Sequence, residues 1–285
     1  MLNGVMLLWF LLTAMAVAFV AIDIRSTPES PVLKWGFVLL TAYTGPIGAF
    51  LYVLGCREPL PGLHERYIAV RWRQVLGSTM HCVAGDGVGI LVGAAISSIL
   101  GLHGLNEVLL EYVLGFAFGW TIFQALFMRD MAGGSYARSL SSTFIPELLS
   151  MNLLMAGMVP AMIILRSVLA SAAGPDASAF WFVMSMALLA GFIVAYPMNW
   201  WLVANNLKHG MMTVRLADTT APAGAHVDAG HAAMGAAAHV GRGGGTASGM
   251  DHGHSAPVPP VPVMTIVSLL ALAAGAMIVR LAVPM

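Results

Sequence analysis

The chain has 285 residues, of which 59% are hydrophobic and 9% are charged, and its formal net charge is zero. A mean hydropathy of +0.83 excludes an ordinary soluble domain, in which about 25% of residues are charged. The lack of a basic surplus excludes a nucleic-acid footprint, and two cysteines are too few for a disulfide framework.

Seven apolar runs near 20 residues long follow one another along the chain, and each is long enough for a transmembrane helix. They comprise residues 2–22, 32–54, 81–102, 108–128, 148–169, 180–203 and 263–283. The pattern predicts an all-α fold, a polytopic bundle of about seven transmembrane helices. Because the first run lacks the basic leader of a signal peptide, we expect a retained first helix. Pro46, Pro160 and Pro197 predict kinks inside three of the helices.

Two further segments complete the predicted organisation. Between the second and third runs, Leu63, Tyr67, Val70 and Val75 fall near one helix face, which predicts a short interfacial helix. The Ala/Gly/Pro/His-rich stretch 217–262 has too few large apolar residues to form a core, so we expect a disordered tether. The predicted units are residues 1–65 (two helices and the interfacial approach), 66–216 (a four-helix core domain), 217–262 (the loop) and 263–285 (the last helix).

The basic residues give an orientation. With seven crossings, the side of the amino terminus holds nine of the 13 Lys and Arg residues and the opposite side holds four. Basic residues favour cytoplasmic loops, so this distribution predicts a cytoplasmic amino terminus and an external carboxyl terminus.

Candidate metal ligands gather where alternate helix ends share one membrane face. The third run begins with His81, Cys82 and Asp86, the fifth begins near Glu147 and Met151, and His209 follows the sixth. Thiolate, thioether, imidazole and carboxylate groups all bind transition metals. The loop adds His252 and His254 to the same candidate set, because flexible His-rich tracts collect metal. We therefore predict a metal site formed by these eight residues.

Each of these features also has a structural interpretation. An ion pair with Arg129 or Lys208, or a hydrogen bond to an asparagine, explains Asp86 as well as a cation or proton site does. The stripe formed by Met151 and three further methionines on the same face fits adaptable core packing as well as a soft-metal route. The histidines of the loop are equally compatible with a low-complexity linker.

Two motifs resemble a known family. His-Cys-Val-Ala-Gly-Asp at 81–86 and Tyr-Pro-Met-Asn-Trp-Trp-Leu-Val at 196–203, followed by Lys-His-Gly-Met at 208–211, resemble the bacterial membrane family called the domain of unknown function numbered four-three-nine-six. The resemblance covers residues 66–212. It implies a multi-helix domain of the bacterial inner membrane. An association of some relatives with multicopper oxidases implies copper as the metal and such an oxidase as a partner.

The leading hypothesis is therefore a membrane protein that handles a transition metal, copper in particular, as a transporter or a membrane-bound donor. Its expected partners are membrane lipid, the metal ion and a multicopper oxidase or other membrane protein. One alternative is a membrane-embedded enzyme that uses Cys82 for thiol-redox or lipid-modifying chemistry, with His209 or Asp86 as base. Another is a non-catalytic assembly subunit. Transport or donation is favoured over catalysis, and no catalytic residue is assigned.

Overall fold

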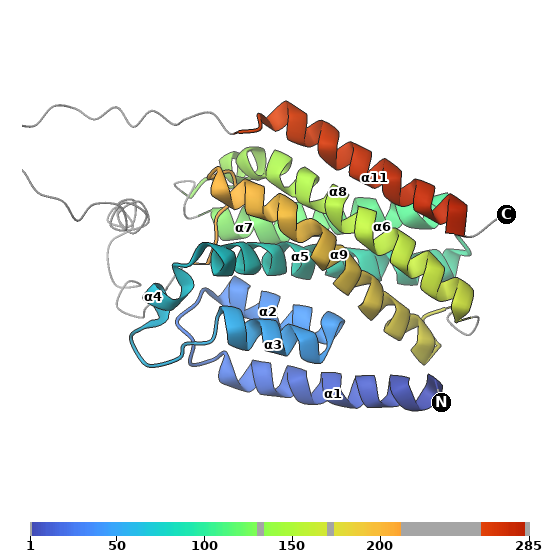
Figure 1. Ribbon diagram of the computed structural model, residues 1–285, viewed down its shortest axis with the longest axis horizontal. Coiled ribbons are helices and arrows are strands. Elements are labelled where there is room, and N and C mark those ends of the chain that lie inside the picture. Colours follow the sequence, from blue (N-terminus) through green and yellow to red (C-terminus); the bar gives the residue numbers. More distant parts are fainter. Residues whose placement is uncertain (1, 130–133, 170–173, 212–257, 283–285) are drawn as a thin grey trace, which may run out of the picture.

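A computed structural model describes residues 2–129, 134–169, 174–211 and 258–282, and this part of the chain is an all-helical bundle (Figure 1). The elements are α1 (Leu2–Asp23), α2 (Pro31–Thr44), α3 (Pro46–Gly55), α4 (His64–Ile68), α5 (Arg71–Leu100), α6 (Leu105–Ala117), the π-helix η1 (Phe118–Gln124), α7 (Ala125–Met128), α8 (Tyr136–Val168), α9 (Ser178–Ala204) and α11 (Val261–Ala282). The predicted all-α fold class is confirmed.

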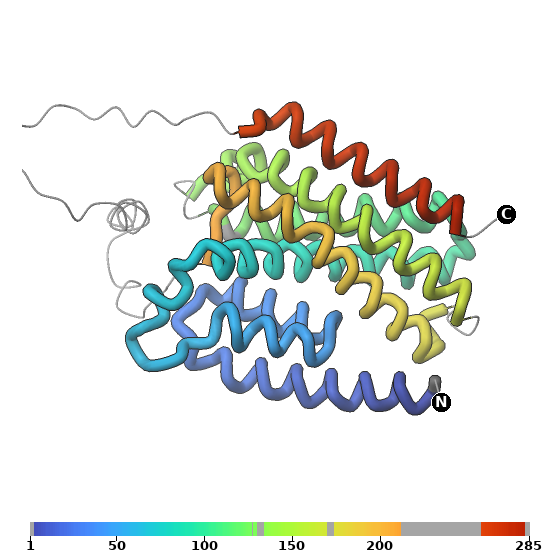
Figure 2. The backbone as a smooth tube through the Cα atoms, in the orientation of Figure 1, coloured from blue at the N-terminus to red at the C-terminus, as the bar shows by residue number. Residues whose placement is uncertain are grey.

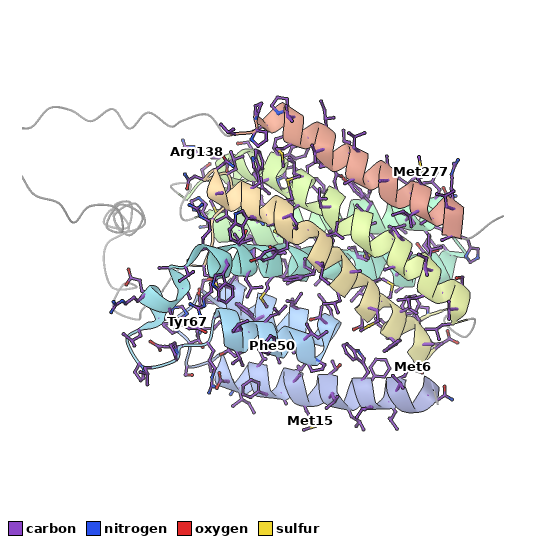
Figure 3. All side chains as sticks on the ribbon, in the orientation of Figure 1. Met6, Met15, Phe50, Tyr67, Arg138 and Met277 are labelled. Carbon is purple, nitrogen blue, oxygen red and sulfur yellow. The ribbon has the colours of Figure 1, made fainter. Side chains whose placement is uncertain are left out.

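The length of its helices and their apolar surface identify the bundle as an integral membrane protein. Among the described residues, five helices (α1, α5, α8, α9 and α11) are long and apolar enough to cross a membrane. The elements α6, η1 and α7 follow one another without a break and add a further helical rod. Met15 on α1 and Met277 on α11 are exposed and project from opposite sides of the bundle (Figure 3). Such outward apolar faces are expected where lipid replaces water.

The segment predicted as a single crossing over residues 32–54 is instead a helical hairpin, α2–α3 (Figure 2). Its helices have 14 and 10 residues, or about 21 and 15 Å, which is too short for a hydrocarbon core about 30 Å thick. Both ends of the hairpin lie beside the end of α1, since Tyr52 near the end of α3 donates a hydrogen bond to Asp23 over 2.8 Å. The hairpin is therefore re-entrant, and that prediction was wrong.

The Gly45-Pro46 pair explains the reversal. Gly45 has φ +61, a conformation that glycine adopts without steric cost, and Pro46 starts the next helix at a position where its missing N–H costs nothing. A Cβ at residue 45 would press against Trp9 and Thr13, which lie in the middle of α1. The tip of the hairpin therefore stops halfway through the bundle.

Protein groups satisfy the backbone at this depth. Thr41 and Thr44 donate their hydroxyl protons to main-chain oxygens one turn earlier, and Ser185 on α9 donates to the Tyr43 carbonyl. Irregular backbone is tolerated inside a membrane only where protein buries it in this way.

The hairpin changes the relation between the two chain ends. The end of α1, the start of α5 and the end of α9 share one end of the bundle, because Asp23 pairs with Arg57 and the Tyr196 hydroxyl donates to the Trp72 carbonyl. We call this the Lys208 end, on the left in Figure 1. The start of α11 also lies there, since Trp201 donates to the Val258 carbonyl. The amino end of α1 and the carboxyl end of α11 thus share the opposite end of the bundle, whereas the sequence predicted opposite membrane faces for them.

Helices α5 and α8 begin earlier than predicted and carry their polar residues deeper. Because α5 begins at Arg71 instead of residue 81, Asp86 lies near its midpoint, not near its end. Small residues let α6 approach this helix closely: a Cβ on Gly89 would overlap the Leu114 carbonyl, and one on Gly93 would lie 2.9 Å from Glu111. The predicted position of α5 inside the bundle is confirmed.

The last helix, α11, packs on α8 at its small residues. Asn152 donates a hydrogen bond to Ser268 over 3.0 Å, and a Cβ on Gly275 would lie 2.7 Å from the Ala156 carbonyl. The predicted tether lies mostly outside the described residues, as do His252 and His254.

Candidate functional site

The interior of the bundle holds five polar side chains that we call the central cluster. They are Cys82 and Asp86 of α5, Gln124 of η1, Glu147 of α8 and Lys208 of the segment after α9. Cys82, Asp86 and Glu147 are fully buried, and the other two are at most 6% exposed. They meet because α5 and α8 start, and α9 ends, at the Lys208 end.

Lys208 reaches the cluster through a turn that folds the chain back after α9. The amides of Leu207 and Lys208 both donate to the Leu202 carbonyl, and Asn206 adopts φ 56, which asparagine tolerates well. Lys208 Nζ then donates to Glu147 Oε2 over 3.0 Å. The two side chains therefore form a buried ion pair.

Cys82 contacts the same carboxylate oxygen. Its thiol donates to Glu147 Oε2 over 3.3 Å, and Gln124 Nε2 donates to Cys82 Sγ over 2.8 Å. One oxygen of Glu147 thus receives two donors, and the sulfur lies between an amide and a carboxylate. This places a soft ligand atom next to a hard one at the same buried position.

Asp86 lies beside the other oxygen of Glu147. The two carboxyl groups lie close together, since a Cβ on Gly119 would meet both, yet among the described residues no hydrogen-bond donor reaches either Asp86 oxygen. The contact fits because η1 has no side chain here: a Cβ on Gly119 would overlap Asp86 and lie 2.7 Å from Glu147 Oε1. Two adjacent carboxylates repel each other, so a proton or a cation must accompany them.

The π-helix holds His81 away from this pair. His81 Nε2 lies 3.0 Å from the Phe123 carbonyl, and its ring packs on the Phe123 ring with centroids 5.6 Å apart. A π-helix shifts the main-chain hydrogen-bond register and is frequent at functional sites. His81 and Cys82, although adjacent in sequence, therefore serve different neighbours.

A cavity of about 210 Å³ reaches toward the cluster from the Lys208 end. Six of its nine lining residues are polar, among them Gln124 and Lys208 of the cluster together with His209. His209 is partly exposed and also lines a smaller recess beside His81. The predicted ligand His209 thus lies at the approach to the central cluster.

The methionine stripe of α8 faces the protein interior. Met151, Met155, Met158 and Met162 are at most 1% exposed. Met151 follows Glu147 by one turn, and its methyl carbon would lie 2.8 Å from a Cβ on Gly115. Burial fits both packing and a route for a soft cation, so the two interpretations remain open.

The structure brings together five of the predicted ligands, and it adds two residues that the sequence did not single out as part of a site. His81, Cys82, Asp86, Glu147 and His209 lie in or around the central cluster, and Gln124, Gly119 and Lys208 complete it. A glutamine and a glycine inside an apolar run carry no signal of their own, whereas the sequence offered Lys208 as an ion-pair partner for Asp86 on the same membrane face. The metal site predicted from these residues stays a prediction.

An all-helical bundle with a buried set of acid, thiol and ammonium groups defines an integral membrane protein with an intramembrane ionisable centre. Residues 71–208 match the family model described as "Domain of unknown function (DUF4396)", so the predicted resemblance is confirmed over this region. All five residues of the central cluster lie within the matched region. Neither the curated proteins nor the solved structures gave a match.

Proposed function

We propose that the protein moves or donates a transition-metal cation across the bacterial inner membrane, with the central cluster as its binding site. The observation that carries this proposal is the Lys208–Glu147 ion pair beside Asp86 and Cys82, buried at the middle of the bundle. Ionisable groups at this depth are costly and mark substrate or ion pathways.

In the proposed cycle, Lys208 acts as an internal cation. Its ammonium neutralises Glu147 when no substrate is present, and a metal ion that enters displaces it. Glu147, Asp86 and Cys82 then supply two carboxylate oxygens and a thiolate, and the Cys82 proton leaves with the displaced charge. Because Lys208 lies on a turn outside α9, the turn can withdraw without breaking a helix.

The soft ligands favour copper(I) as the cargo. A thiolate and thioethers prefer Cu(I), and Met151 with the rest of its stripe continues from Glu147 along α8. A second buried acid, Glu111, lies on the α5–α6 interface toward the opposite end, and among the described residues no donor reaches its carboxylate oxygens. It offers a further step for a cation beyond Asp86. Transfer to a multicopper oxidase remains a prediction of the sequence resemblance.

The basic residues support an orientation in which the Lys208 end faces the cytoplasm. In the described part of the chain, eight Lys and Arg residues outside the buried central cluster lie at this end: Arg25, Lys34, Arg57, Arg66, Arg71, Arg73, Arg129 and Arg138. Arg166 and Arg280 lie at the opposite end. The positive-inside rule then places both the amino end of α1 and the carboxyl end of α11 outside the cytoplasm.

Metal uptake into proteoliposomes tests the proposal. We expect copper(I) uptake by the wild-type protein and its loss in Asp86→Asn and Glu147→Gln, while Glu65→Gln keeps it, because Glu65 is an exposed acid on α4. Copper binding in detergent should fall in the same two variants. Uptake that is equal in all four proteins, or absent from the wild type with both copper(I) and zinc, would contradict the proposal.

The contact of Cys82 with Glu147 Oε2 also fits the nucleophile and base of a membrane-embedded enzyme, with Glu147 in place of the predicted His209 or Asp86. This alternative requires a reactive thiol. Fast modification of Cys82 by a thiol reagent at neutral pH would favour it over transport.

A further inference from the structure

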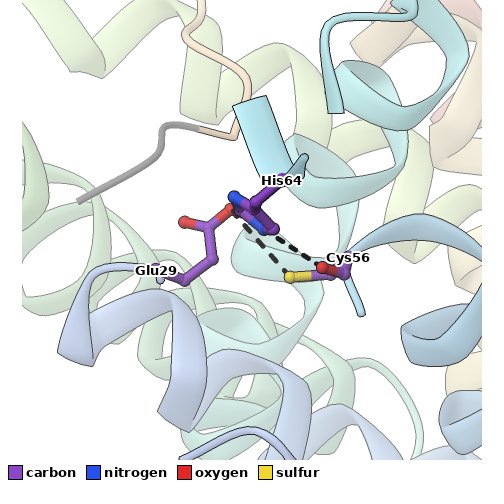
Figure 4. Close-up of side chains that lie close together, drawn as sticks. All are labelled: Glu29, Cys56 and His64. Carbon is purple, nitrogen blue, oxygen red and sulfur yellow. Dashed lines mark hydrogen bonds and ion pairs between the residues drawn. The ribbon is translucent and has the colours of Figure 1, made fainter. Parts of the chain in front are cut away.

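A second polar cluster lies outside the matched region, where the re-entrant hairpin meets α4. Glu29 comes from the loop before α2, Cys56 follows α3, and His64 begins α4; Figure 4 shows the three side chains converging. All three are buried, with Cys56 and His64 at 0% exposure and Glu29 at 4%. Among the described residues, this is the only group of three or more His, Cys, Asp or Glu whose ligand atoms all lie within 4.8 Å of one another.

The re-entrant hairpin creates this cluster. Glu29 and Cys56 are 27 residues apart, and His64 follows Cys56 by eight. A continuous helix over residues 31–55 would separate Glu29 and Cys56 by the thickness of the membrane. The turn at Gly45 instead returns α3 to the level at which α2 began, so a loop, a helix end and a helix start each contribute one ligand.

The spacing of the three ligand atoms suits a tetrahedral metal ion. Bonds of about 2.3 Å to sulfur and about 2.0–2.1 Å to nitrogen and oxygen place ligand atoms about 3.3–3.6 Å apart at tetrahedral angles. Glu29 Oε1 lies 3.6 Å from His64 Nε2 and 3.9 Å from Cys56 Sγ. These separations are too long for strong hydrogen bonds and are within a few tenths of an ångström of metal-ligand spacing.

We propose that Glu29, Cys56 and His64 bind a divalent transition-metal ion of the zinc type, which fixes the base of the hairpin to α4. One thiolate, one imidazole and one carboxylate form a mixed ligand set that Zn²⁺ accepts. His64 Nε2 then gives up its contact with the Cys56 carbonyl, 3.1 Å away, and Nδ1 carries the ring proton. That carbonyl oxygen or a water molecule completes the fourth position.

This site is independent of the central cluster. Its ligands precede residue 71 and share no residue with the transport site, so its role is to hold the hairpin in place. A resident ion here would remain bound while cargo passes through the centre. The two sites can therefore be separated by experiment, because each contains one of the two cysteines of the chain.

Cobalt(II) is the probe, since a cobalt–thiolate bond gives a near-ultraviolet charge-transfer band that histidine and carboxylate ligands do not give. The full-length Cys82→Ser protein retains Cys56 as its only thiol, and we expect it to show this band with one Co²⁺ per chain, displaced by Zn²⁺. Cys82→Ser with Cys56→Ser should lose the band. The histidines of residues 212–257 cannot produce it, so they do not confuse the result.

A matched carboxylate pair extends the test to Glu29. Glu29→Gln, made in the Cys82→Ser protein, should weaken Zn²⁺ binding by more than about tenfold, because even changes in the outer shell of a zinc site cost roughly 10–100-fold. Glu65→Gln, next to His64 but exposed, should leave it unchanged. Absence of the cobalt band from the folded Cys82→Ser protein would overturn the site, as would equal Zn²⁺ affinity in the two glutamine variants. Neither result bears on copper uptake, which tests the central cluster separately.

Discussion

Replacement of Lys208 by methionine should be one of the most damaging single changes in the bundle. The side chains of Lys208 and Glu147 are only 4% and 0% exposed, so solvent does not screen their interaction. Removal of one partner from a buried pair leaves an uncompensated charge and costs about 3–5 kcal/mol. That is a large fraction of a typical unfolding free energy of about 5–15 kcal/mol. Glu147→Gln should cost less, because the ammonium keeps Asp86 as a neighbouring carboxylate.

The double variant Lys208→Met with Glu147→Gln should recover most of the loss, since no isolated charge then remains at this position. The assay is unfolding in a denaturing-detergent titration, followed by the fluorescence of the seven tryptophans. Lys34→Met is the matched control, because the other lysine of the chain is only partly buried and donates to the Arg25 carbonyl instead of a carboxylate. Equal destabilisation by Lys208→Met and Lys34→Met would refute the reasoning, and so would a double variant as unstable as Lys208→Met alone.

Three further outcomes follow from packing and topology. Gly119→Ala should destabilise the protein by about 1–3 kcal/mol and abolish copper binding, because the new methyl group overlaps Asp86. The control Gly4→Ala should do neither, because no atom lies within 4 Å of its new Cβ. Cys56 and Cys82 are both buried, so a thiol reagent should modify the native protein slowly and both thiols only after unfolding; rapid native labelling would contradict their burial. Protease-accessible tags on the two chain ends should be cleaved from the same membrane face, and cleavage from opposite faces would exclude a re-entrant α2–α3.

Hydropathy predicted the crossing helices well because apolar length is a direct requirement of the bilayer. It failed at residues 32–54 because two short helices and the turn between them together have the length of one crossing. The Gly45-Pro46 pair was a turn signal, but Pro46 alone was interpreted as a kink. Whether the chain reverses or only kinks at this pair depends on the groups that satisfy the broken backbone. Ser185 lies far away in sequence, and the threonines of α2 lie inside the apolar run itself.

The sequence also did not predict how deep in the bundle the central cluster lies. The predicted interfacial helix extended to Val75, yet Arg71, Arg73 and Gln74 belong to the first turn of α5. Their side chains can lie there because Arg73 and Gln74 donate to main-chain carbonyls of α4 over 2.8 and 2.7 Å. Asp86 consequently lies near the middle of its helix. The convergence of α5, α8 and the end of α9 needed only alternating helix directions, so the sequence could anticipate which residues meet but not how deep they lie.

The charge distribution and the hairpin contacts are independent observations that agree on the crossing count. If residues 31–55 crossed the membrane, Arg25 and Lys34 would join Arg166 and Arg280 on the less basic face. The re-entrant hairpin moves both to the Lys208 end, which leaves only Arg166 and Arg280 opposite among the described residues. The positive-inside rule depends on loops and not on packing, so it could have contradicted the hairpin. Instead, the hairpin increases the excess of basic residues at the Lys208 end over the opposite end. The turn at Gly45-Pro46 sets the number of membrane crossings and also brings Glu29 to Cys56. The topology and the proposed second metal site therefore depend on the same two residues.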